Sequence, residues 1–156
     1  MLSKLTGFLH LTRRERCLFL EAFCLSGMVR LALLIIPFRR LSLFLGKQAV
    51  ESPWDENSES IQVAGAIGRA VETASRYTPW ESKCFVQALV AKIMLRQMDI
   101  ANTLYLGVVR DGRKGLAAHA WLRCGGLMVT GGPGENRFTK VGSFADCKKN
   151  VRAERR

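Results

Sequence analysis

The spacing of apolar residues changes once along this chain, near Asn102, and that change limits the folds open to it. Before this point apolar residues recur every three or four positions, as on one face of a helix. Two such helices are predicted, one from Ile61 to just before Pro79 and one over about 82–98. The second helix is expected to bury Phe85, Leu89, Ile93 and Met94.

After Asn102 the pattern is that of strands. Strands are predicted over 103–110, 116–124 and 127–130, with 138–144 as a fourth. Turns are predicted at Asp111-Gly112 and at Gly125-Gly126, the second a tight hairpin. Helices followed by antiparallel strands predict an α+β domain.

Residues 17–37 form an apolar stretch with arginines on both sides, interrupted by Glu21 and Arg30. A charge near the centre of a membrane-spanning helix costs roughly 2.5 to 3.5 kcal/mol, so a span is not favoured, although membrane contact stays an alternative. A secretory signal is not favoured either, because Glu21 breaks its apolar part. Two amphipathic helices, about 11–28 and 30–46, account for the same residues by hiding their apolar faces against the domain or a partner.

Capping residues and a proline predict where the N-terminal helices begin and break. Thr12 followed by Glu15 is a capping-box pattern for a helix start, and Pro37 predicts a break in the second helical stretch. Residues 48–60 are acidic and contain serine and proline, with no apolar period. The chain is therefore divided into a basic helical region, 1–50, an acidic linker, 51–60, and a domain, 61–156.

The chain is strongly basic, with a formal charge of +11 gathered mainly at its two ends. Such a charge attracts an acidic peptide, nucleic acid or an anionic membrane. Nucleic acid is not favoured, because no aromatic residues are interleaved with the basic ones and no nucleic-acid-binding motif occurs. An acidic protein or peptide is the expected partner.

The cysteines form neither a disulfide framework nor a metal pattern. They are Cys17, Cys24, Cys84, Cys124 and Cys147, an odd number without a C-x-x-C pair. With two histidines far apart, no zinc site is expected. Free thiols in a reducing cytoplasm fit this usage best.

One cysteine and one histidine stand out by position. Cys84 falls at the predicted start of a helix, and His119 lies in the strand segment Ala118-His119-Ala120-Trp121. A helix N-terminus and an imidazolium both stabilise a thiolate, and the backbone N–H of Cys84 could help bind an oxyanion. Each residue alone is more often structural. Their order, element types and neighbouring tryptophans together favour thiol-dependent acyl transfer.

The sequence around this pair resembles the B-type proteins of lasso-peptide biosynthesis, which are transglutaminase-like cysteine proteases that remove the leader from a precursor peptide. The similar segments are 84–89, 95–96, 106–108, 118–122 and 129–132. The resemblance implies a transglutaminase- or papain-like core, with the cysteine helix packed on an antiparallel sheet. It also implies a stand-alone leader peptidase without a recognition domain of its own.

For the reaction, the resemblance implies that Cys84 attacks the carbonyl at the leader–core junction and that His119 protonates the leaving amine. Trp80, Ser82 and Trp121 are the candidate substrate-binding residues. No cofactor is needed. The implied partners are the precursor peptide, a small leader-binding protein and an ATP-dependent lasso cyclase. The basic N-terminal helices either dock the leader-binding protein or complete the fold.

The third member of the family's Cys-His-Asp triad is open, because no aspartate occurs between His119 and Asp146. With a two-residue turn at Gly125-Gly126, His119 would lie opposite Gly132, with Thr130 on the same face. Thr130, Glu135 or a backbone carbonyl could orient the imidazole. Two other classes remain: an acyltransferase of transglutaminase or arylamine acetyltransferase type, and a non-catalytic binding or membrane-associated module.

Overall fold

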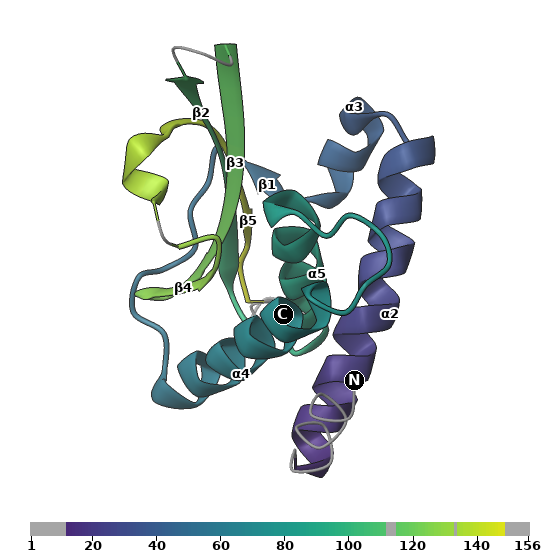
Figure 1. Cartoon of the computed structure of the whole chain (residues 1–156). Helices are drawn as coiled ribbons and strands as arrows, with labels where there is room; N and C mark the ends of the chain where they lie inside the picture. The colour runs from purple at the N-terminus through teal and green to yellow at the C-terminus, as the bar shows by residue number, and fades with distance from the viewer. Residues whose placement is uncertain (1–11, 112–114, 133, 149–156) are drawn as a thin grey trace.

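Five helical segments precede the main strands in the computed structural model, which describes residues 12–111, 115–132 and 134–148 (Figure 1). The longer helices are α2 (Arg13–Ile35), α4 (Ser58–Ser75) and α5 (Cys84–Gln97). Between α2 and α4 lie the short helices α3 (Phe38–Leu41) and η1 (Ser42–Phe44), followed by the short strand β1 (Lys47–Gln48).

The remaining strands are β2 (Asn102–Asp111), β3 (Gly115–Cys124), β4 (Leu127–Thr130) and β5 (Thr139–Asp146), with the short helix η2 (Glu135–Arg137) before β5. They form one antiparallel sheet with the order β1-β5-β2-β3-β4. The predicted α+β class is confirmed, and each predicted strand is present. The Gly125-Gly126 hairpin is also confirmed, since Cys124 pairs with Leu127. The predicted Asp111-Gly112 turn lies partly outside the described residues.

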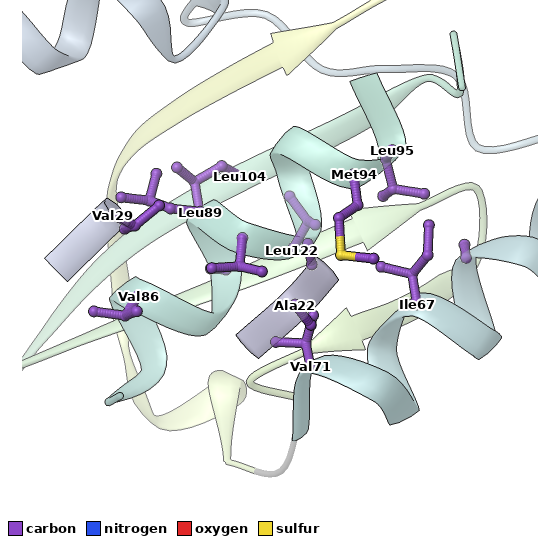
Figure 2. Packing of buried hydrophobic residues seen from close by; sticks show 14 of the residues in the cluster. Ala22, Val29, Ile67, Val71, Val86, Leu89, Met94, Leu95, Leu104 and Leu122 are labelled. Carbon is purple, nitrogen blue, oxygen red and sulfur yellow. The ribbon is translucent and has the colours of Figure 1, made fainter. Parts of the chain in front are cut away.

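The molecule has three layers. Helices α4 and α5 pack between the sheet and α2, which contacts both of them (Figure 1). Figure 2 shows the core where these layers meet: Ala22 and Val29 come from α2, Ile67 and Val71 from α4, and Leu104 and Leu122 from the sheet, around the apolar residues of α5. The inner face of α2 is therefore part of the core.

The prediction of two N-terminal helices meeting near residue 29 is wrong, because one helix runs unbroken from Arg13 to Ile35. The predicted start and break are confirmed: Thr12 and Glu15 form a capping box, and Pro37 separates α2 from α3. The interior of α2 contains Gly27, against which the Trp80 ring packs. A Cβ at Gly27 would lie 3.0 Å from Trp80 Cζ2.

The segment after β1 runs along the sheet. Ser52 is buried, and its N–H and hydroxyl both bond to Thr103 Oγ1 at 2.8 Å. Arg123, buried on the face of the sheet away from α5, donates to the carbonyls of Ser52 and Pro53 and lies 3.9 Å from the centre of the Trp54 ring. The polar groups of Ser52 and the carbonyl of Pro53 are thus hydrogen-bonded to residues of the sheet that lie far away in the sequence.

Candidate active site

Cys84 is the first residue of α5. Lys83, the residue before it, has an extended backbone (φ −74°, ψ 176°) and gives the helix no side-chain cap. The first N–H groups of α5 therefore have no side-chain acceptor from the capping position. The approach to Cys84 is held by Gln87, whose Nε2 donates to the Ser82 carbonyl at 2.8 Å. The predicted position of Cys84 in the first helical turn is confirmed.

His119 lies on β3 and is half-buried. Its ring lies between two aromatic neighbours, with centroid distances of 5.8 Å to Trp121 and 4.9 Å to Phe138. Its Nε2 is 2.8 Å from the carbonyl oxygen of Gly131. A carbonyl can only accept a hydrogen bond, so in the neutral ring Nε2 carries the proton and Nδ1 is the free base.

Gly131 follows β4 with φ +70°. A Cβ at this position would lie 2.4 Å from the carbonyl oxygen of Ala120 and 3.1 Å from Trp121 Cα, so the backbone fits only as glycine. The turn at Gly131 directs its carbonyl to the His119 ring. The backbone carbonyl, one of the three orienting groups considered from the sequence, is therefore the group that holds Nε2.

Cys84 and His119 line the same open cavity, of about 590 Å³. Its walls come from α4, the start of α5, β3 and the end of β4; they are Gly68, Glu72, Ser75, Arg76, Cys84, Gln87, His119 and residues 128–132. Glu72 and Arg76 form an ion pair of 2.6 Å on the α4 wall. The thiol and the ring share no hydrogen bond in this structure. His119 alternates along β3 with Trp121 and Arg123, so its side chain leaves the sheet on the face away from α5 and meets the cavity beside Gly131, where β4 has ended.

The other candidate third members lie elsewhere. Thr130 is on the cavity wall, but its buried hydroxyl has no hydrogen-bond partner within the described residues. It pairs with Leu122, because a bulge between Leu122 and Arg123 shifts the register of β3 and β4. The predicted pairing of His119 with Gly132 is therefore wrong. Glu135 begins η2 and makes no side-chain hydrogen bond within the described residues.

The three candidate substrate-binding residues do not line the cavity. Trp80 packs on α2, where its Nε1 donates to Ser26 Oγ at 3.1 Å. The Ser82 hydroxyl accepts from Thr78 Oγ1 at 3.0 Å, and Trp121 is buried between Tyr105 and His119. Their substrate contacts stay a prediction.

The structure adds residues that the sequence reasoning did not assign to the site: Glu72, Arg76, Gln87 and Gly131. Gln87 had an available signal, since three residues after Cys84 is the same face of a helix. Arg76 and Glu72 could not be found from spacing, because they come from a helix whose distance to Cys84 depends on packing. No group of three or more His, Cys, Asp and Glu side chains gathers within the described part of the chain.

A second cysteine shows the contrast between a site thiol and a core thiol. Cys124 is fully buried at the end of β3, and this burial raises the pKa of its thiol to about 11. It therefore stays protonated near neutral pH and behaves as a small apolar residue. Cys84 is half-buried at a cavity wall.

A half-buried thiol at the start of a helix and a strand-borne imidazole line one cavity, and these are the two groups that thioester-forming cysteine enzymes use. Residues 32–143, more than two thirds of the chain, match the Transglutaminase-like superfamily. The chain belongs to this superfamily, whose members are generally cysteine proteases or acyltransferases. No curated protein and no solved structure matches it.

Proposed function

We propose that this protein is a cysteine peptidase that removes the leader from a ribosomally made lasso-peptide precursor before macrocyclisation. The observation that carries the proposal is the shared cavity of Cys84 and His119, with Gly131 holding the His119 ring. Membership of the superfamily supports thioester chemistry. The choice of a lasso precursor rests on the resemblance of segments 84–89 and 118–122 to the leader peptidases of that pathway.

The first step joins the thiol to the substrate. Nδ1 of His119 takes the proton of the Cys84 thiol, and Sγ attacks the carbonyl carbon at the leader–core junction. The backbone N–H of Cys84, at the start of α5, stabilises the oxyanion that forms. Nδ1 then gives its proton to the leaving amine, so the core peptide departs with a free N-terminus and the leader stays as a thioester.

Water completes the cycle. Nδ1 takes a proton from water as it attacks the thioester, and the leader leaves as a carboxylic acid while Cys84 regains its proton. Throughout, Nε2–H donates to the Gly131 carbonyl. A carbonyl stabilises the imidazolium less than a carboxylate would, so a lower rate than that of a full triad is expected.

The partners belong to the same proposal. A separate leader-binding protein presents the precursor, and an ATP-dependent cyclase uses the freed N-terminus. The cavity is wide and holds the Glu72–Arg76 pair and small residues such as Gly68. An extended peptide with both polar and apolar side chains fits such walls.

The test is intact-mass analysis of a candidate precursor peptide incubated with the protein, with and without a leader-binding protein. We expect one cut, accelerated by the partner and abolished by Cys84→Ala and by His119→Ala. Cys24→Ala and Cys147→Ala are matched controls, because both thiols are exposed and lie outside the cavity. These controls should cut as the parent does.

The product mass separates this proposal from the acyltransferase reading. A transferase resolves the same thioester with an amine, so the leader gains the mass of that amine instead of water. Such a product would overturn the peptidase proposal but keep the roles of Cys84 and His119. No cut, with Cys84 also unreactive to iodoacetamide under native conditions, would overturn both in favour of a non-catalytic module.

A further inference from the structure

Helix α2 has one buried face and one exposed apolar face. The buried face, with Leu18, Ala22, Ser26 and Val29, packs against α4 and α5. The opposite face carries exposed residues spaced three and four apart, which we call the outer stripe: Cys17, Leu20, Cys24, Met28, Leu31, Leu34 and Ile35. This amount of exposed apolar side chain on one helix indicates an interaction surface.

The apolar surface continues past the end of α2. Phe38, Leu43 and Phe44, on α3 and η1, are also exposed. Met28 and Phe44 line the same cavity, of about 290 Å³, which places η1 beside the middle of the outer stripe. Three helical segments thus contribute exposed apolar side chains beside one another.

Positive charge lies at both ends of this surface. Arg13 and Arg14 are exposed at the start of α2, and Arg39 and Arg40 are exposed on α3. The outer stripe as defined holds no charged residue, and Glu21, four residues after Cys17 and seven before Met28, lies partly exposed at its edge. Arg30 does not lie on the stripe, because it is half-buried and pairs with Glu81 at 3.3 Å. The surface therefore has an apolar centre and cationic ends.

We propose that this surface binds an anionic bilayer, with α2 lying in the plane of the membrane interface. Apolar side chains with flanking arginines are what such a surface attracts, by burial in the headgroup–acyl boundary and by attraction to anionic lipids. A protein partner would usually be met by hydrogen-bonding groups at about one per 100–200 Å². Apart from two thiols, the outer stripe offers no polar side chain over a helix of 23 residues.

The buried face decides how the helix meets the membrane. By length and composition α2 could cross a bilayer. Crossing would remove Leu18, Ala22 and Val29 from the core that they share with α4 and α5. Lying flat keeps that core and buries only residues that are already exposed. No α2 residue lines the cavity of Cys84 and His119. Helix α2 lies on the side of α4 and α5 away from the sheet (Figure 1).

The test is co-sedimentation of the full chain with vesicles of two parts phosphatidylcholine to one part phosphatidylglycerol, compared with pure phosphatidylcholine. Leu20→Glu/Leu31→Glu changes the outer stripe, where these side chains are 53% and 58% exposed. The matched control is Leu116→Glu/Val141→Glu, which adds the same charge at sheet residues that are 67% and 63% exposed. Thermal unfolding of each variant checks that the fold is kept.

We expect binding to the anionic vesicles that falls roughly a hundredfold in the stripe variant and little in the control. Arg39→Gln/Arg40→Gln should lower it by roughly fivefold for each arginine, and high salt should lower it further. Absent binding, or equal loss in the stripe variant and the control, would overturn the proposal. The proposal would also be overturned if the unmutated protein did not bind vesicles but used the outer stripe to form a dimer or to bind the leader-binding protein.

Discussion

At the scale of single residues, the backbone carbonyl of Gly131 orients the His119 ring, a role that the aspartate side chain has in the Cys-His-Asp pattern. This carbonyl holds Nε2 of His119 at 2.8 Å, and a φ of +70° aims that carbonyl at the ring. Sequence reasoning could place Cys84 and His119, because a helix start and a strand are local patterns. It could not choose among Thr130, Glu135 and a carbonyl, because that choice depends on a bulge in β3 and β4.

Gly131→Ala should lower the rate of cleavage without unfolding the protein. The added Cβ would lie 2.4 Å from the Ala120 carbonyl, so the backbone must shift and its own carbonyl must leave Nε2. We expect kcat to fall by about tenfold or more with KM little changed, because the ring loses its fixed tautomer. Thr130→Val is the neighbouring control. It removes a buried hydroxyl that has no partner within the described residues, and should keep both activity and stability.

Nitrogen NMR of the histidine rings provides a readout that does not depend on the substrate. The chain has two histidines, so His10→Asn leaves one ring to assign. The parent should show the tautomer with the proton on Nε2, and Gly131→Ala should show a mixture of both tautomers. An unchanged tautomer in Gly131→Ala would contradict the orienting role of the carbonyl.

At the scale of elements, the longest helix was the least well predicted. Two helices were predicted to meet near residue 29, yet α2 runs unbroken from Arg13 to Ile35 through Ser26 and Gly27. Ser26 donates to the Phe23 carbonyl at 2.7 Å and accepts from Trp80 Nε1, while Gly27 leaves room for the indole ring. Both residues serve a contact with a side chain more than fifty positions away. Strands were predicted more closely, since alternation is a local signal.

This contact also fixes the segment that leads into Cys84, and it can be tested by a double-mutant cycle. Ser26→Ala should lower the free energy of unfolding by about 1 kcal/mol, since the indole N–H loses its acceptor. In a Trp80→Phe background the same change should cost clearly less. Ser42→Ala is the control, because its hydroxyl makes a similar bond to the Arg39 carbonyl away from Trp80. Denaturant unfolding gives the four values, and additive effects would contradict the coupling.

At the scale of the whole molecule, one buried cation joins the helices to the sheet. Lys92, on α5, has a side chain that is 2% exposed. Its Nζ donates to Asn102 Oδ1 at 2.9 Å and to the Phe144 carbonyl at 3.1 Å, and it lies 3.0 Å from Asp146 Oδ2. Burial lowers the pKa of Lys92 to about 8, although the Asp146 carboxylate raises it in part. The charge is thus placed where α5, β2 and β5 meet.

This lowered pKa predicts how stability changes with pH. Above about pH 8 the folded protein releases the Lys92 proton, while the unfolded chain keeps it up to its ordinary value of 10.5. The unfolded state then binds more protons, so the free energy of unfolding should rise with pH, by at most about 1.4 kcal/mol per pH unit. Cys124 acts in the opposite sense from pH 9, where an unfolded thiol ionises, to about 11, where the folded one does.

The two groups together predict a rise in Tm between about pH 8 and 9 that levels off above 9. Lys92→Met should remove the rise in Tm, because it removes the group whose pKa is lowered on folding. Cys124→Ala should extend the rise toward pH 10.5, because it removes the thiol whose raised pKa opposes it. Lys47→Met, at an exposed lysine of β1, should leave the profile unchanged. Calorimetric scans across this range measure the slope independently of any loss in absolute Tm. A flat or falling Tm for the parent between pH 8 and 9 would show that Lys92 stays charged in the core, held by Asp146 more strongly than burial disfavours it.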